Sequence, residues 1–174
     1  MAALIIFIIL ILSSGAPLYL LSAVVLHEAG HILAALLVAG EFPVLRFNIA
    51  GVKLKYDGLS GTAKQITVSA AGPFVSILFG LIFYGKRNFA LLSLGLGIVN
   101  LLPISCLDGG NILRAVAEKL FVPWLSKYIC KAFSVIGALF VFALNCAVQL
   151  KYGANISLAL ICVYLLYCSL GQDI

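Results

Sequence analysis

The chain has 174 residues, of which 64% are hydrophobic and 10% are charged, and its mean hydropathy is +1.20. Soluble domains carry roughly 25% charged residues, so this composition excludes an ordinary soluble protein and indicates a membrane protein. A membrane span needs about 20 apolar residues, so residues 1–174 allow at most about six or seven crossings in one compact membrane domain.

The charged residues and the cysteines exclude two further classes. The net charge of +5 comes from Lys and Arg residues scattered over short segments between apolar runs, which favours anchoring at a membrane surface, and no nucleic-acid partner is expected. The five cysteines form no CxxC pair and mostly fall within apolar runs, which predicts free thiols rather than a disulfide framework or a cysteine metal site.

The first two apolar runs predict two membrane spans. Residues 2–13 are short for a span and could instead belong to a signal peptide, but no basic segment precedes them and Pro17 directly follows the small residues that could be cleaved. We therefore expect a retained first span over about 1–14. A second span over about 17–39 opens near Pro17 and closes before Gly40.

Residues 41–65 have a different pattern. Apolar and polar residues alternate over 44–49 and again over 52–56, with Ala50 and Gly51 between the two runs, which predicts a small membrane-associated β-hairpin between the second and third spans. Such a hairpin could accept an extended peptide by strand addition, or it could simply pack across the mouth of the helix bundle.

Four further spans are expected at about 66–85, 88–106, 131–150 and 154–170, which gives an all-α polytopic membrane protein with about six transmembrane helices. Residues 111–128 are amphipathic and end near Trp124, a candidate interface anchor. They predict a helix that lies on the membrane or extends the fourth span.

The basic residues predict the orientation. Six spans place eight of the eleven Lys and Arg residues on the side of the N-terminus and only three on the other side. The positive-inside bias makes the first side cytoplasmic, with both termini there. The eight are Arg46, Lys53, Lys55, Lys64, Arg114, Lys119, Lys127 and Lys131, and the three are Lys86, Arg87 and Lys151.

The two histidines of the chain lie four residues apart in the second span, in the segment His27-Glu28-Ala29-Gly30-His31. Positions i and i+4 share a helix face, so both imidazoles can reach one Zn²⁺ while Glu28 projects about 100° around the helix, as in helices of zinc metalloproteases. An ionisable residue inside a span costs about 2.5–3.5 kcal/mol, which zinc binding of about 10–16 kcal/mol can offset. The alternative is a pair of histidines in interhelical hydrogen bonds beside a protonated Glu28.

A catalytic zinc usually has three protein ligands and one water, so a third ligand is needed. Asp108 is the best candidate because it is embedded in a mostly apolar stretch, at the predicted end of the fourth span. Asp57 is explained by turn chemistry after the hairpin. Cys106 could bind zinc, but on a continuing helix its side chain would point away from that of Asp108, which favours packing.

The pairing of HEAGH with NLLPISCLDGG, residues 100–110, resembles the site-2 protease family of intramembrane zinc metalloproteases, and most closely its stage IV sporulation protein FB group. The resemblance implies that His27, His31 and Asp108 hold zinc and that Glu28 is the catalytic glutamate. Asn100 and Pro103 match the family's Asn-x-x-Pro, which implies a role in binding substrate. Gly72-Pro73 also matches the family, whereas Ser76 stands where members often have Asn. A single domain over 1–174, without PDZ or CBS domains, is expected.

The resemblance implies a zinc endopeptidase that cleaves in or near a transmembrane segment of a membrane-bound substrate, in regulated proteolysis such as that of a sporulation transcription-factor precursor. The expected partners are that substrate and the lipid bilayer of a bacterial cytoplasmic membrane; any regulatory membrane partner is unknown. His31 lies roughly 12 Å from the cytoplasmic end of its helix, so a polar channel opening to the cytoplasm is expected. The alternatives are a metal-ion transporter or a catalytically silent scaffold that binds membrane helices.

Two local features complete these expectations. The resemblance further implies that the amide of Asn100 holds extended substrate backbone and that Pro103 sets the bend that turns Asp108 toward the metal. The Gly109-Gly110 pair predicts either a close helix approach or a break in the backbone just after Asp108.

Overall fold

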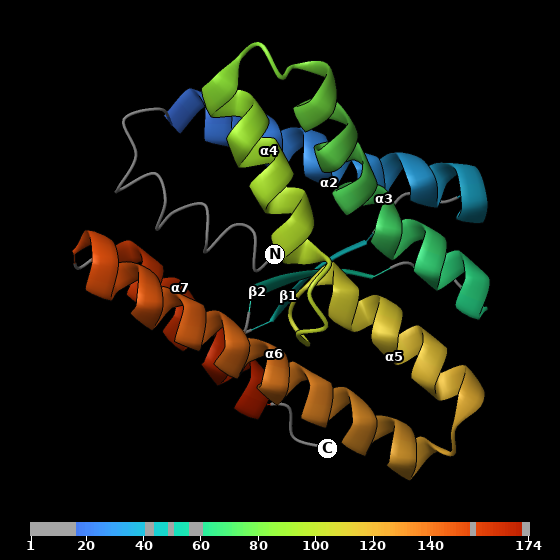
Figure 1. The fold of residues 1–174 in the computed structure, drawn as a ribbon. Helices are drawn as coiled ribbons and strands as arrows, with labels where there is room; N and C mark the ends of the chain where they lie inside the picture. Colours follow the sequence, from blue (N-terminus) through green and yellow to red (C-terminus); the bar gives the residue numbers. More distant parts are fainter. Residues whose placement is uncertain (1–16, 41–43, 49–50, 56–60, 154–155, 172–174) are drawn as a thin grey trace.

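The computed structural model describes residues 17–40, 44–48, 51–55, 61–153 and 156–171, so the first expected span, about 1–14, lies outside the described residues. Six helices and two short strands are found in these ranges (Figure 1). They are α2 (Pro17–Ala39), β1 (Val44–Asn48), β2 (Gly51–Lys55), α3 (Thr62–Ile82), α4 (Arg87–Asn100), α5 (Asp108–Leu120), α6 (Pro123–Tyr152) and α7 (Ile156–Leu170).

Three of the described helices are long and apolar enough to cross a membrane: the segments Leu18–Val38, Thr62–Ile82 and Pro123–Lys151 of α2, α3 and α6. The expected span at 88–106 is wrong in its bounds, because α4 has only 14 residues and ends at Asn100. At 1.5 Å per residue it is roughly 21 Å long, which is less than the roughly 30 Å hydrocarbon core. The total of six spans therefore stays a prediction.

The amphipathic segment 111–128 is not one helix. α5 ends at Leu120, and α6 begins at Pro123, so Trp124 lies on α6. Proline lacks a backbone N–H and forces the residue before it out of helical conformation, and Val122 accordingly has φ −63° and ψ 151°. α5 also does not extend α4, because residues 101–107 separate the two helices. The expected span at 131–150 begins eight residues too late, because α6 already begins at Pro123.

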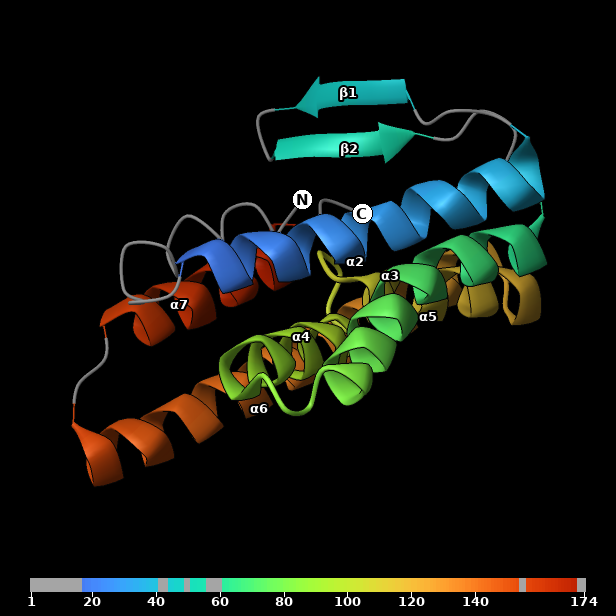
Figure 2. The same cartoon turned by 90° about the horizontal axis from the view of Figure 1, so that it is seen from above.

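The two strands are antiparallel, with Val44 opposite Lys55 and Asn48 opposite Gly51. They fall within the segment where alternation predicted a hairpin. Figure 2 shows the pair beyond α2, at one edge of the helix bundle. Its association with a membrane stays a prediction.

The helices form two groups that meet around α5 and the turn that precedes it. α3 packs against α2, α4 and α5, while α6 packs against α7 and α5 (Figure 1). Glycines bring the first group together: a Cβ on Gly30 of α2 would lie 2.9 Å from the Ala71 carbonyl oxygen, and one on Gly97 of α4 would lie 2.9 Å from the Pro73 carbonyl oxygen. This close approach places the faces of α2 and α3 in direct contact.

Candidate metal centre

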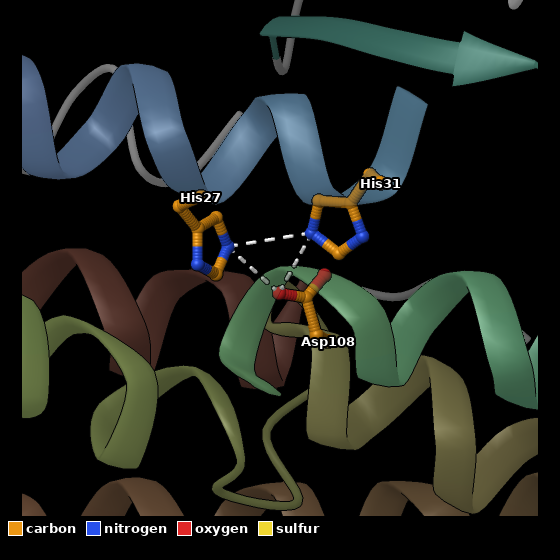
Figure 3. Close-up of side chains that lie close together, drawn as sticks. All are labelled: His27, His31 and Asp108. Carbon is orange, nitrogen blue, oxygen red and sulfur yellow. Dashed lines mark hydrogen bonds and ion pairs between the residues drawn. The ribbon is translucent and has the colours of Figure 1, made fainter. Parts of the chain in front are cut away.

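α2 presents His27 and His31 on one face, as their spacing predicts. Both side chains are buried, and their Nε2 atoms lie 3.3 Å apart (Figure 3). Most other residues of α2 are apolar, so the two imidazoles are polar groups within a largely apolar helix.

Asp108 completes the group from 77 residues further along the chain. It is the first residue of α5, not the end of the fourth span, because the chain leaves α4 at Asn100 and passes through the extended Leu107 before α5 starts. Its Oδ2 lies 3.1 Å from Nε2 of His27 and 3.2 Å from Nε2 of His31 (Figure 3). One oxygen and two nitrogens therefore converge on one point.

The outer nitrogen of each imidazole has its own partner on α3. Nδ1 of His31 donates to the Val68 carbonyl oxygen at 2.7 Å, and since a carbonyl only accepts, Nδ1 carries a proton and Nε2 faces Asp108 and His27. Nδ1 of His27 lies 2.9 Å from Oγ of Ser76, whose side chain is buried. Metal-binding histidines use their second nitrogen in this way to fix tautomer and ring orientation.

Two residues of this arrangement were not recognised from the sequence. Ser76 was noted only as a departure from a family pattern, and Val68 contributes a backbone carbonyl that no side-chain motif reveals. One signal was available: Gly72 and Ser76 lie four residues apart and share one face of α3. That face lies against the two histidines, since a Cβ on Gly72 would be 2.2 Å from Nε2 of His31.

The donor set fits zinc. Tetrahedral zinc has bonds of about 2.0–2.2 Å to imidazole nitrogen and carboxylate oxygen, which separates neighbouring ligand atoms by roughly 3.3–3.5 Å. The three observed separations are 3.1, 3.2 and 3.3 Å. Among the described residues, His27, His31 and Asp108 are the group of side chains close enough together to bind one metal ion. Lone pairs that face each other at this distance inside a protein need a cation or a proton between them.

Asp108 lies outside the three candidate spans, and its side chain is 17% exposed. Burial opposes ionisation of this carboxyl, but hydrogen bonds from His27 and His31 outweigh it and lower the pKa of Asp108 to about 2. The side chain is therefore a carboxylate at neutral pH, the form in which it can bind a metal.

The other predicted site residues do not belong to this group. Glu28 is half-buried on α2, directly after His27. Asn100 is buried at the end of α4, where its Nδ2 donates to the Leu96 carbonyl oxygen at 2.9 Å. Pro103 is half-buried within the turn 101–107. Cys106 packs against the hydrophobic core instead of joining the group, and Asp57 lies outside the described residues.

Gly109 and Gly110 allow a close approach, but the backbone does not break after Asp108, because both belong to the first turn of α5. A Cβ on Gly109 would lie 2.2 Å from the Leu101 carbonyl oxygen, and one on Gly110 would lie 2.1 Å from the Ile104 carbonyl oxygen. The first turn of α5 thus packs directly against the backbone of the turn 101–107, which fixes the position of Asp108.

The sequence is similar to a protein-family model and to known proteases. A model of peptidase family M50 matches residues 87–144, which include Asn100, Pro103 and Asp108 but not the two histidines. A zinc metalloprotease of Methanocaldococcus jannaschii is 31% identical over 57% of this chain and 33% of its own length. The regulator of sigma-E protease RseP of Salmonella typhimurium is 43% identical over 38% of this chain and 14% of its own length.

The fold is also that of a solved protein. The site-2 protease from Methanocaldococcus jannaschii superposes with a TM-score of 0.67 at 24% identity, covering 96% of this chain and 84% of that one. The chain spans about a third or less of the curated relatives named above. The chain is thus similar to peptidase family M50 over residues 87–144, and it shares the fold of a solved site-2 protease.

Proposed function

We propose that this protein is a zinc-dependent intramembrane endopeptidase that cleaves a peptide bond in or near a transmembrane segment of a membrane-bound substrate. The observation that carries the proposal is the convergence of Nε2 of His27, Nε2 of His31 and Oδ2 of Asp108 between apolar helices, with Glu28 next to the first of them. The metalloprotease relatives favour the same conclusion.

In this proposal His27, His31 and Asp108 hold the zinc. Bound there, the ion supplies a Lewis acid for the scissile carbonyl and lowers the pKa of a nearby water. Ser76 and the Val68 carbonyl hold the two imidazoles with their Nε2 atoms inward, so the ligand geometry exists before the metal binds.

Glu28 serves as the general base and acid. On an α-helix it lies about 100° from His27 and about 60° from His31, so its carboxylate flanks the face that presents the two ligands. It accepts the proton of the attacking water and returns it to the leaving amine. A site that only bound a metal would not need this carboxylate beside its first ligand.

The substrate must reach this site in an extended form, because a transmembrane helix shields its peptide bonds by internal hydrogen bonding. We assign Asn100 and Pro103, which flank the start of the turn before Asp108, to substrate binding. β1 and β2 offer strand edges for main-chain hydrogen bonds with the unwound segment.

The active site opens to the cytoplasm and both termini are cytoplasmic in this scheme, as the distribution of Lys and Arg predicts. Membership of the stage IV sporulation protein FB group and a transcription-factor precursor as substrate stay predictions.

The decisive experiment compares wild type with Glu28→Gln in reconstituted vesicles that contain candidate membrane substrates. The variant is expected to retain one zinc per chain by elemental analysis and to lose cleavage, read as fragments cut near a span by mass spectrometry. Undiminished cleavage by Glu28→Gln would remove Glu28 from the mechanism. Zinc binding without cleavage by wild type on any membrane substrate would favour a transporter or a silent scaffold.

A further inference from the structure

Three serines connect the turn before Asp108 to the last two helices. The backbone N–H of Ser105 donates to Oγ of Ser134 at 2.9 Å, and the Ser105 hydroxyl donates to the same oxygen at 2.8 Å. The Ser134 hydroxyl donates to Oγ of Ser169 at 3.1 Å, and the Ser169 hydroxyl lies 2.8 Å from the Leu165 carbonyl oxygen. Ser134 on α6 and Ser169 on α7 are both completely buried.

The same turn also supplies the apolar core of this half of the molecule. Ile104 and Leu107 are fully buried and cluster with Ala138 of α6 and with Ile161 and Leu165 of α7. Gly137 of α6 makes room for this, since a Cβ there would lie 3.1 Å from Cγ1 of Ile104. Apolar contacts and serine hydrogen bonds therefore fasten the turn to α6 and α7 on one side.

On its other side the turn leads directly into the candidate metal centre. Ser105 precedes Asp108 by three residues, and the glycines after Asp108 rest on the turn's carbonyls. α6 packs on α5 and α7, whereas α2 and α3 carry the histidines and their partners. The histidines thus lie on α2, whereas Asp108 begins α5, which packs against both α3 and α6 and is reached directly from the turn 101–107.

We propose that Ser134 is a positioning residue for Asp108: by accepting both hydrogen bonds from Ser105, it holds the turn so that Oδ2 of Asp108 meets the two imidazoles. The proposal rests on the metal centre described under the proposed function. It assigns α6 and α7 a role in shaping that centre, although neither helix supplies a ligand. Ser134 does not contact the metal ligands itself. Its loss is therefore expected to lower the affinity for zinc while His27, His31 and Asp108 all remain available as ligands.

The test uses the full chain in detergent, freed of metal, as wild type and as the variants Ser134→Ala, Ser134→Thr and Ser126→Ala. Ser126 is the matched control because it is a buried serine of the same helix that does not bond to the turn in the described contacts. Zinc affinity is measured by competition with a chelator, the coordination geometry by the visible absorption of bound Co²⁺, and fold stability by thermal unfolding of the metal-free protein.

Ser134→Ala is expected to weaken zinc binding about 10-fold, at the low end of losses caused by groups that orient metal ligands, and to alter the Co²⁺ absorption. Ser134→Thr, which keeps the hydroxyl, should recover most of the affinity, and Ser126→Ala should match wild type. If Ser134→Ala binds zinc as tightly as Ser126→Ala, the proposal is overturned, even if its unfolding temperature falls, because a purely structural serine would change stability alone.

A second variant covers the case in which Ser134→Ala does not fold. Ser105→Ala removes only the hydroxyl bond and leaves the backbone N–H bonded to Ser134, so a loss of zinc affinity smaller than 10-fold is expected, and an unchanged affinity would overturn the proposal. Absence of zinc binding by wild type would instead contradict the proposed function itself. The two failures are therefore distinguished by the wild-type titration.

Discussion

Gly72 lies directly against His31, so closely that a Cβ at position 72 would be 2.2 Å from Nε2 of the imidazole. The same nitrogen lies 3.2 Å from Oδ2 of Asp108. A backbone position on α3 thus limits where the His31 ring can stand, and it does so at the atom that faces the other two donors. The absence of a side chain at Gly72 is a condition for the centre to form.

Gly72→Ala is expected to displace the His31 ring and to lower zinc affinity by on the order of 100-fold, since outer positions that merely orient a ligand already account for 10- to 100-fold. Zinc affinity of the purified variant, measured by chelator competition, checks this. The control is Gly95→Ala on α4, where a Cβ would meet no atom within 4 Å. That variant should bind zinc normally and gain about 0.5–1 kcal/mol of stability from the better helix former. Equal zinc affinity in the two variants would contradict the role of Gly72.

Ser76→Ala removes the partner of Nδ1 of His27, so the ring is free to turn and to change tautomer. Zinc affinity is expected to fall by about 10- to 100-fold. Ser93→Ala is the matched control, because Ser93 is an equally buried serine on the neighbouring helix α4 that takes no part in the donor set. A Ser76→Ala protein with the zinc affinity of the control would show that packing alone holds the His27 ring.

Asp108→Asn keeps the shape of the side chain and removes its charge. Because the carboxylate supplies one of three donor atoms, zinc binding is expected to weaken by at least about 100-fold. Elemental analysis after dialysis against a weak chelator measures the remaining metal. Glu118→Gln, on the exposed side of the same helix, should retain full zinc content. If Asp108→Asn retains zinc and cleavage, the third ligand is a different residue.

Gly109→Ala places a Cβ 2.2 Å from the Leu101 carbonyl oxygen, so either α5 or the turn 101–107 must shift. Stability of the metal-free protein is expected to fall by about 1–3 kcal/mol, the usual cost of overpacking. Thermal unfolding in detergent measures the change. Gly85→Ala, where a Cβ would have no atom within 4 Å, is the control and should unfold at the wild-type temperature within error. An unchanged unfolding temperature for Gly109→Ala would mean that the turn is not held as described.

Local pattern was sufficient for several features. The apolar runs predicted α2 and α3 to within a few residues, because a long apolar helix corresponds to an unbroken run of apolar residues in the sequence. The spacing of His27 and His31 predicted a shared face, because the helix repeat alone determines which residues lie above one another. Composition alone indicated a membrane protein, since so few charged residues cannot cover a soluble surface.

The breaks in the chain were harder to predict. Residues 88–106 and 111–128 are each apolar or amphipathic throughout, yet the chain turns at 101–107 and again before Pro123. Hydropathy reports how apolar a segment is and not where its helix ends. Ile104 and Leu107 of the turn before Asp108 pack against α6 and α7, which are distant in sequence and leave no signal in the local pattern.

The sequence by itself determined the kind of environment, the helical face of the two histidines and Asp108 as the candidate to join them, because each is a property of composition or short-range periodicity. Only the tertiary structure decided how the centre is assembled: Ser76 and Val68 lie 49 and 37 residues from the histidines they hold, and Asp108 lies 81 and 77 residues away. Contacts over such separations arise from the packing of α2 on α3 and of the turn 101–107 on α6 and α7. A single sequence contains no periodic signal for them.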